Sequence, residues 1–283
     1  LLAIREASLN MFFGPIAFAV MWDFHFARAV DTWRCKYGIA AGRWIDAVGR
    51  LEALCALSTY AYEHPGDPFP TISNDSPVFD GKGLGHPLLP ERSFVRNDVV
   101  LDAQQRLLIL SGSNMSGKTV LLRTVGANVV LALAGAPVRA HSLSLSPLRI
   151  GATLNVHDAI QDGISRFYAE IKRIRMLMDI AQGPTPLLFL FDEIFHGTNS
   201  CDRRVGAHAV LRELLHAGAI GITTTHDLAI TELAQEFQGS AVNVHFEDHL
   251  KQGRLVFDYR LRPGVVEKSN ALDLMRAIGL RVD

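Results

Sequence analysis

The chain has 283 residues, which is enough for one large domain or for one domain with a smaller attachment. Hydrophobic residues make up 48% and charged residues 20%, a balance that is ordinary for a globular protein with a sizeable core and argues against disorder. The 28 Lys and Arg residues are matched by 29 Asp and Glu residues, so bulk charge favours neither nucleic acid nor an anionic membrane as partner.

The three cysteines, Cys35, Cys55 and Cys201, are never spaced as CxxC. This argues against a disulfide framework or a zinc site and favours a reducing cytoplasm. The chain begins with Leu-Leu inside a helical pattern, so we expect a fragment of a longer protein. The apolar run at 11–22 is interrupted by a Gly-Pro pair and is shorter than the roughly 20 residues of a membrane span. We therefore expect a buried or packing helix there, and leave open a membrane segment upstream.

Residues 16–62 are expected to be helical. Apolar positions in the second half of this stretch recur every three to four residues, which predicts one buried helix face. The positions on that face are Ile45, Val48, Leu51, Leu54 or Cys55, Ser58 and Tyr62. The segment HPGDPFP at 64–70 cannot continue a helix, because it contains three prolines and a glycine. We place a domain boundary there, with a helical segment over 1–70 and a second domain over 71–283.

Beyond Thr71 the hydrophobic period changes. Two short strands around a polar turn are predicted over 99–112, and LLIL has the apolar character of a strand buried on both faces. The remaining elements are expected to be a helix over 118–134, a loop-rich stretch to His157, a helix over about 165–180, a strand over 186–193, a helix over 202–216, a strand over 218–225, a helix from Asp227 and a hairpin centred on 251–253. This alternation predicts an α/β fold with a mostly parallel sheet flanked by helices.

The octet GSNMSGKT lies between the predicted strand LLIL and the predicted helix 118–134, which is the context of a P-loop. Its glycines let successive N–H groups point at phosphate oxygens, and the helix N-terminus adds its positive end. Lys118 would neutralise the β- and γ-phosphates, and the Thr119 hydroxyl would ligate Mg²⁺. A solvated Gly-Ser turn is the alternative. The expected nucleotide-binding residues of the loop are Gly112, Ser113, Asn114, Met115, Ser116, Gly117, Lys118 and Thr119.

Acidic and imidazole groups follow two of the predicted strands. Asp192 comes after the apolar run LLFLF, at the sheet edge where ligands bind, and is expected to hold Mg²⁺. Glu193 is placed to polarise an attacking water as general base. His226 ends the next strand at the same edge, where an imidazole could reach a γ-phosphate. The alternatives are a solvent-facing pair of acids and a structural histidine.

Together these stretches resemble the ATPase domain of the MutS mismatch-repair family, over roughly residues 40–283. SNMSGKT is similar to that family's Pro-Asn-Met-Gly-Gly-Lys-Ser loop. The other stretches that carry the resemblance are GHPLL with FVRND, DAIQDGISRFYAEI, DEIFHGTNSCD and TTTHDLAITELA. The resemblance implies a P-loop NTPase fold of the ABC-ATPase type, with ATP and Mg²⁺ as cofactors.

The resemblance also implies roles for single residues. Phe94, with Val95 beside it, would contact the adenine, and Asn114 would place the hydrolytic water or the γ-phosphate. Ser165 would reach the γ-phosphate bound by the other subunit of a head-to-tail homodimer. Asn199 and Ser200 would lie at that dimer interface, although alone they are typical of a helix N-cap.

The chain departs from the family pattern at several positions. Ser116 replaces the second loop glycine, and Phe-His-Gly at 195–197 stands where the family has Arg-Gly. Near the C-terminus, KSNALDLMRAIGL replaces a Ser-Tyr/His-Gly segment. These differences indicate a divergent MutS-related branch.

Two main hypotheses of function remain open. The first is an ATPase that couples ATP-driven dimerisation to DNA engagement, with the DNA contacts largely outside this chain. The second is an ATP-dependent dimerisation switch or scaffold with little turnover, which does not act on mismatches and could lie at a membrane. A P-loop phosphotransferase is a third hypothesis, but no Arg-rich lid is apparent. Glu193 favours the first, because a pure switch needs no base beside Asp192.

Overall fold

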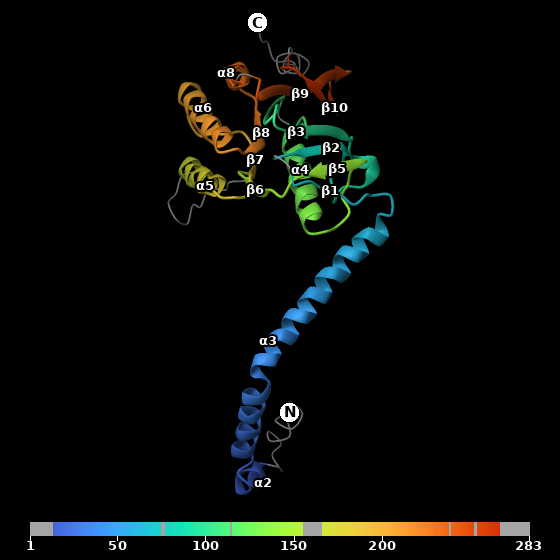
Figure 1. Cartoon of the computed structure of the whole chain (residues 1–283), viewed down its shortest axis with the longest axis vertical. Helices are drawn as coiled ribbons and strands as arrows, with labels where there is room; N and C mark the ends of the chain where they lie inside the picture. Colours follow the sequence, from blue (N-terminus) through green and yellow to red (C-terminus); the bar gives the residue numbers. More distant parts are fainter. Residues whose placement is uncertain are drawn as a thin grey trace. The chain divides into compact units, whose positions relative to one another are not determined.

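The computed structural model describes residues 14–74, 77–113, 115–154, 166–237, 239–251 and 254–266. The chain divides into two compact units, Leu1–Thr59 and Tyr60–Asp283 (Figure 1). This division falls a few residues before the boundary expected at 64–70. The assignment of 1–70 and 71–283 as separate domains stays a prediction.

The first unit contains two helices, α2 (Gly14–Ala19) and α3 (Trp22–Glu63), and α3 continues into the second unit. No residue of α3 is buried, so the expected buried face is wrong for this chain: Leu51 is 61% exposed and Tyr62 88% exposed. In the described part of 11–22, Ala17 is buried but Phe18 is 88% exposed, so the expected burial holds for Ala17 and fails for the large side chain of Phe18. A helix buries a face only against another element, and α2 is the one other helix described in this unit.

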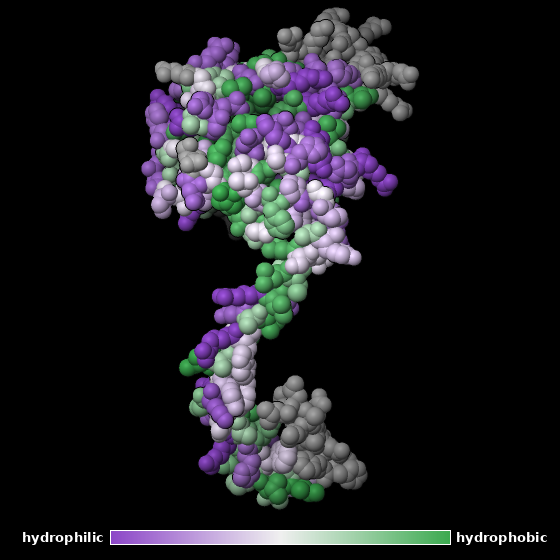
Figure 2. Space-filling view, turned by 45° about the vertical axis from the view of Figure 1, so that its right-hand side comes forward, coloured by the Kyte–Doolittle hydropathy of each residue, from purple (hydrophilic) through white to green (hydrophobic). Residues whose placement is uncertain are grey.

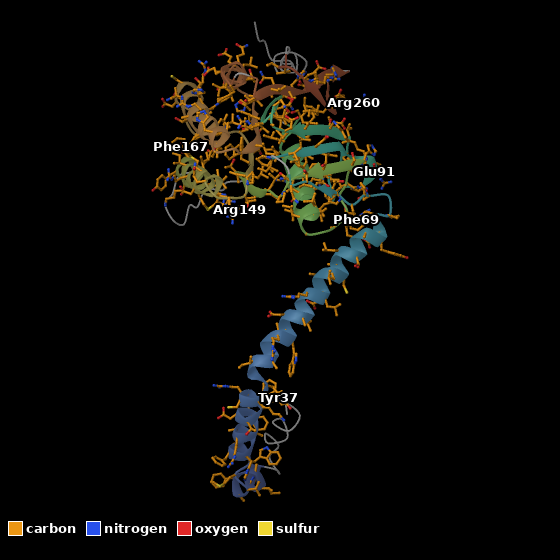
Figure 3. All side chains as sticks on the ribbon, viewed as in Figure 1. Tyr37, Phe69, Glu91, Arg149, Phe167 and Arg260 are labelled. Carbon is orange, nitrogen blue, oxygen red and sulfur yellow. The ribbon has the colours of Figure 1, made fainter. Side chains whose placement is uncertain are left out.

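Apolar side chains therefore lie on the surface of α3 (Figure 2). The ring of Tyr37 lies between those of Trp33 and Trp44, with centroids 6.3 and 6.1 Å away (Figure 3). The rings of each pair lie on one side of the helix, as expected for residues four and seven positions apart. Within the described residues, no helix has both the length and the apolar character that crossing a bilayer requires.

The second unit has a mixed α/β fold built on a six-stranded sheet. Its strands, in spatial order, are β10 (Arg254–Pro263), β9 (Ala241–Lys251), β4 (Leu107–Ser111), β8 (Ile220–Thr225), β7 (Leu187–Phe191) and β6 (Arg149–Ala152). Neighbouring strands are parallel except for the β9–β10 hairpin. The predicted parallel sheet and hairpin are confirmed. All five residues of β4 are buried, as LLIL predicted.

Helices cover both faces of this sheet (Figure 1). Alternate residues of β4 point to opposite sides: Leu108 and Leu110 join a core with α4, while Leu107 and Ile109 join a core with α5 and α6. The helices are α4 (Lys118–Leu133), α5 (Arg166–Ala181), α6 (Ser200–His216), α7 (Leu228–Thr231) and α8 (Leu233–Glu236). The helix expected from Asp227 is thus two short helices.

A second, four-stranded sheet lies beside α4, in the order β1-β5-β2-β3. Its elements are β1 (Thr71–Ile72), β2 (Phe79–Leu84), β3 (Asn97–Leu101) and β5 (Ser142–Leu145), with the 3₁₀ helix η1 (Glu91–Ser93) between β2 and β3. The stretch expected to be loop-rich contains β5 and β6, while His157 lies outside the described residues. Strands of four residues carry too little periodicity to be recognised without their pairing partners. Furthermore, β3 and β4, which the sequence placed around one turn, belong to different sheets.

Candidate functional site

The octet 112–119 forms the turn that joins strand β4 to helix α4. Both of its glycines have φ angles that other residues rarely adopt: 149° at Gly112 and 103° at Gly117. A Cβ atom at Gly112 would lie 2.9 Å from Ser116 Oγ, and one at Gly117 would lie 3.1 Å from Cδ1 of Tyr259. The turn is therefore too tight and too closely packed for side chains at these two positions. Asn114 lies outside the described residues.

Lys118 is the first residue of α4, and its side chain is only 6% exposed. Its ammonium group donates hydrogen bonds of 2.8 Å to the carbonyl oxygens of Gly112 and Ser113, so it ties the loop to the helix. Burial lowers the pKa of Lys118, and the carboxylates of Glu193 and Asp192 partly oppose that shift. The cation lies at the sheet edge where the two acids were expected.

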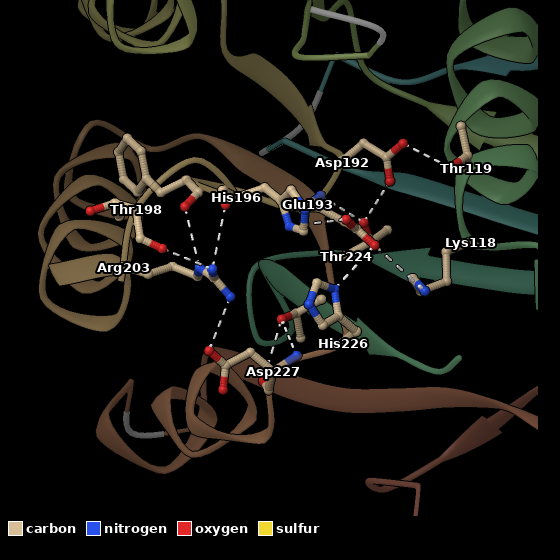
Figure 4. Close-up of polar contacts among 12 residues, drawn as sticks. Lys118, Thr119, Asp192, Glu193, His196, Thr198, Arg203, Thr224, His226 and Asp227 are labelled. Carbon is tan, nitrogen blue, oxygen red and sulfur yellow. Dashed lines mark hydrogen bonds and ion pairs between the residues drawn. The ribbon is translucent and has the colours of Figure 1, made fainter. Parts of the chain in front are cut away.

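Asp192 is bound by two threonine hydroxyls at the carboxyl end of the sheet (Figure 4). Thr119 Oγ1 donates to Asp192 Oδ2 at 2.7 Å, which joins the loop to β7. Thr224 Oγ1 donates to Asp192 Oδ1 at 2.7 Å and accepts a hydrogen bond from the Glu193 N–H at 3.0 Å. Sequence reasoning brought Asp192 to Thr119 correctly but missed Thr224, whose only signal is its place beside β7 at the end of β8.

Glu193 is the centre of a group of cationic and imidazole side chains (Figure 4). Its Oε1 lies 3.2 Å from Nδ1 of His226 and 3.9 Å from Nζ of Lys118. Its Oε2 lies 3.4 Å from Nδ1 of His196. The backbone of Glu193 has φ 52°, a left-handed conformation that is strained for a residue with a side chain. The expected proximity of Glu193 and His226 is present, and His196 is an addition that sequence reasoning missed.

Arg203 of α6 holds the loop that follows Glu193 (Figure 4). Its guanidinium donates to the carbonyl oxygens of Phe195 at 3.2 Å, Thr198 at 3.0 Å and His196 at 3.5 Å. The same group pairs with Asp227 Oδ2 at 3.2 Å. Since Asp227 directly follows His226, one arginine fixes the two loops that carry the histidines.

A cavity of about 390 Å³ opens beside Lys118 and Thr119. Phe94 and Val95 line it, as do Asn97 and Tyr259, which sequence reasoning did not select. Tyr259 lies in an irregularity of the β9–β10 hairpin, where the register shifts between Phe257 and Leu261. The sequence pattern of the hairpin does not indicate where this irregularity falls, so it could not place Tyr259 at the cavity. A volume of this size suits a small-molecule ligand.

Asn97 fixes the hairpin at this wall of the cavity. Its Nδ2 donates to the carbonyl oxygen of Tyr259 at 2.9 Å, and its Oδ1 accepts from the Leu261 N–H at 2.7 Å. The guanidinium carbons of Arg96 and Arg139 lie 5.6 and 5.9 Å from the ring centre of Phe94. These contacts hold two aromatic side chains at the rim of one cavity.

The residues expected at a dimer interface are described only in part. Asn199 is the N-cap of α6 and accepts a hydrogen bond from the Asp202 N–H at 2.9 Å, and Ser200 begins that helix. Both are exposed. Ser165 lies outside the described residues. The interface roles of all three stay predictions.

The cysteines Cys35, Cys55 and Cys201 are exposed free thiols.

Comparison with known proteins identifies the family. Residues 108–282, more than half of the chain, match the family described as MutS domain V. The chain belongs to the MutS family. The resemblance found in the sequence is thereby confirmed, and the loop, Asp192, Glu193 and His226 all lie inside the matched region.

Curated MutS-family relatives match the chain at about one third identity. They include a DNA mismatch repair protein MutS of Natronomonas pharaonis, 33% identical over 239 residues (83% of this chain and 27% of the relative). An Endonuclease MutS2 of Thermus thermophilus is 34% identical over 196 residues (69% and 25%), and one of Shouchella clausii is 31% identical over 238 residues (83% and 29%). The chain thus spans about a quarter of the length of the curated relatives it matches.

Proposed function

We propose that this chain binds ATP with Mg²⁺ and hydrolyses it to ADP and phosphate, as the P-loop ATPase part of a MutS-type mismatch-repair protein. The observation that carries the proposal is the meeting of Lys118 and Thr119 with Asp192 and Glu193 at one sheet edge. These residues come from two segments more than 70 positions apart, and each type suits a separate task in handling a polyphosphate.

The loop supports a phosphate ligand. Its two glycines have no side chains that would block a ligand from the backbone. Helix α4 begins at Lys118 without a side-chain cap at Gly117, so the N–H groups of its first turn can donate to phosphate oxygens. The buried Oγ atoms of Ser113 and Ser116 have no hydrogen-bond partner among the described residues. Buried hydroxyls normally find partners, so phosphate oxygens are a fitting ligand for them. Lys118, at present bonded to loop carbonyls, would supply the positive charge.

The hydroxyl of Thr119 and the carboxylate of Asp192 fit Mg²⁺, since this ion prefers oxygen ligands and keeps several waters. The bound ion would neutralise charge on the phosphates. Thr224 holds the Asp192 carboxylate toward the loop from the opposite side. The adenine would lie in the cavity between Phe94, Val95 and Tyr259, because aromatic rings bind nucleobases by stacking.

For hydrolysis, Glu193 would accept the proton of the water that attacks the γ-phosphorus, and ADP would leave. His226, 3.2 Å away, orients the Glu193 carboxylate and would reach the γ-phosphate. Lys118 near the same carboxylate would stabilise charge that develops on the transferred group. Asn114 is proposed to place the water.

Dimerisation and DNA engagement complete the proposal. Ser165, Asn199 and Ser200 would contact the nucleotide or surface of a second copy, so that ATP favours a homodimer. The family membership supports an action on DNA through parts of the protein outside this chain. The names of the relatives, a mismatch repair protein and endonucleases, do not choose between mismatches and other DNA structures.

The experiment compares Glu193→Gln with the control Glu232→Gln. The side chain of Glu232 is 63% exposed, and the residue follows Asp227 in the chain. We expect the Glu193 variant to keep the ATP affinity within a few-fold and to lose roughly 10²- to 10⁴-fold in turnover, as for removal of a general base. The control should match the wild type. Filter binding measures affinity, and phosphate release measures turnover.

Equal turnover of the Glu193 variant and the wild type would remove Glu193 from the reaction. Tight ATP binding and ATP-dependent dimerisation without turnover in the wild type would instead establish the switch function. Absence of ATP binding in the wild type, checked against Lys118→Ala, would overturn the proposal as a whole.

A further inference from the structure

Three potential metal ligands converge at the end of the sheet, next to the proposed Mg²⁺ site. The carboxylate of Glu193 and the imidazoles of His196 and His226 each offer one ligand atom, and these atoms all lie within 4.8 Å of one another. We infer that they form a separate, inhibitory site for a divalent transition-metal ion of the Zn²⁺ type.

Each imidazole lies at nearly tetrahedral ligand spacing from one oxygen of Glu193, and one ligand atom from each of the three residues can be chosen within 4.8 Å of the others. Zn²⁺ binds nitrogen and oxygen at roughly 2.0–2.2 Å, which places tetrahedral ligands about 3.3 Å apart. Nδ1 of His226 lies 3.2 Å from one Glu193 oxygen, and Nδ1 of His196 lies 3.4 Å from the other. Both imidazoles are exposed at 38% and 44%, so small rotations can bring their nitrogens to one ion. Three protein ligands leave the fourth position to water.

The ligand types separate this site from the one proposed for Mg²⁺. Imidazole nitrogen suits Zn²⁺, Cu²⁺ and Ni²⁺, whereas Mg²⁺ prefers the all-oxygen surroundings of Thr119 and Asp192. The Lys118 ammonium, 3.9 Å from Glu193 Oε1, repels a second cation. The carboxylate alone is therefore insufficient, and both imidazoles are needed.

The site is also held in place from behind. Arg203 donates to backbone carbonyls on both sides of the His196 position and pairs with Asp227, the residue after His226. The two histidine loops are thus tied to one side chain. Outer contacts of this kind fix the spacing of metal ligands and raise affinity. The rings of His196 and His226 already lie 5.3 Å apart between centroids.

Metal binding would stop hydrolysis without closing the nucleotide pocket. The positive charge of a bound metal ion strongly lowers the affinity of the ligating carboxylate for a proton, so Glu193 would be too weak a base to accept a proton from water. Phosphate binding through Lys118 and Thr119 would persist. This consequence rests on the proposed function, whereas metal binding itself does not.

The binding test uses Co²⁺, whose visible absorption is strong in four-coordinate sites, in a background with Cys35, Cys55 and Cys201 changed to serine. Those exposed thiols would otherwise compete for the ion. With Mg²⁺ in excess, we expect one Co²⁺ per chain and displacement by Zn²⁺. His196→Ala should weaken binding by about tenfold or more, since it removes one of three ligands.

His208→Ala is the matched control. His208 pairs with Glu236 at 3.3 Å, which is the same His–Glu geometry without a third metal ligand among the described residues. We expect this variant to bind Co²⁺ like its parent. Circular dichroism checks that each variant is folded, and His196→Asn serves as a second substitution that keeps a polar side chain.

The inhibition test measures phosphate release against Zn²⁺ concentration at constant excess Mg²⁺, each variant relative to its own zinc-free rate. Zinc should inhibit the parent and His208→Ala alike, and about tenfold more zinc should be needed for His196→Ala. Equal Co²⁺ binding by the His196 and His208 variants, or no tetrahedral Co²⁺ spectrum, would overturn the site. Co²⁺ binding without any ATPase activity would leave the site standing and refute the proposed function.

Discussion

Replacing Thr224 by valine removes one hydroxyl that serves both acidic residues of the site. The side chain is fully buried, and its Oγ1 donates to Asp192 while accepting from the backbone N–H of Glu193. Valine has nearly the same shape, so packing is kept and only the two hydrogen bonds are lost. The expected result is a less stable unit and slower hydrolysis.

The magnitude follows from the two bonds. A hydrogen bond to a charged carboxylate contributes about 1.5–3 kcal/mol, and leaving a backbone N–H without a partner costs about 1–3 kcal/mol when it is buried. Glu193 is half-buried, so the lower end applies to its N–H. We expect the Thr224 variant to lose about 2.5–4 kcal/mol of unfolding free energy. Glu193, at φ 52°, would also lose one of the contacts that hold its strained backbone.

The neighbouring Thr223 provides the control. It is equally buried, in the same strand, but its Oγ1 has no hydrogen-bond partner among the described residues. Thr223→Val removes an unsatisfied hydroxyl, so it should be neutral or stabilising. The comparison isolates the hydrogen bonds of Thr224 from the general effect of a threonine-to-valine change in β8.

The assay has to report on the second unit. All three tryptophans, Trp22, Trp33 and Trp44, lie in α3, so tryptophan fluorescence would follow the other unit. Amide hydrogen exchange in peptides of β7 and β8, read by mass spectrometry, measures opening of the sheet directly. If Thr224→Val and Thr223→Val protect these amides equally, the reasoning about the Thr224 hydroxyl is refuted.

Three further predictions concern the charge, the pH dependence and the cavity. Lys118→Met should abolish ATP binding yet leave the nucleotide-free protein at least as stable as the wild type. Because burial lowers the pKa of Lys118, the buried charge reduces the unfolding free energy of the wild type by its full amount below the folded pKa, and this cost shrinks as pH rises toward 10.5. Urea unfolding of both proteins at several pH values tests this. Tyr60→Phe should lose about 1.5–3 kcal/mol of unfolding free energy, because it removes the hydrogen bond that the Tyr60 hydroxyl donates to the Asp67 carboxylate. Burial and Asp67 raise the pKa of Tyr60 to about 12, so the extra unfolding free energy of the wild type over the variant is full below pH 10 and is lost as pH rises through about 12. A difference in unfolding free energy that stays constant at high pH would contradict this prediction. Phe94→Ala and Tyr259→Ala should each weaken ATP binding about tenfold in competition assays, as expected for the loss of one stacking contact. The affinity for inorganic tripolyphosphate, which has no base to stack, should not change.

The parts of the site that lie in contiguous motifs could be predicted from the sequence. The loop 112–119 is recognisable by the spacing of its glycines between an apolar strand and a helix. Asp192 and Glu193 follow an equally apolar strand. Parallel strands end at one edge, so Thr119 and Asp192 could be expected at the same edge once both strands were recognised, and the structure joins them by a hydrogen bond. The family followed from the same motifs.

Residues outside those motifs could not be predicted. Asn97 and Tyr259 reach the cavity only because β3 of one sheet contacts the irregular hairpin of the other. Their positions depend on pairings across more than 160 residues, and no local pattern encodes such a pairing. The exposure of α3 is a similar case, because a periodic apolar face shows that a helix can pack but not that a partner is present.

The sequence by itself therefore determined the local elements of the proposed site: the glycine-containing loop 112–119, the acidic pair at 192–193 and the alternation of strands and helices around them. Only the tertiary structure decided the surroundings of these residues. The Thr224 hydroxyl bonds to Asp192, Arg203 binds the loop that carries His196, and His196 and His226 converge on Glu193. The reason is physical: local spacing fixes backbone conformation, whereas side-chain neighbours depend on which distant elements the packed core brings together.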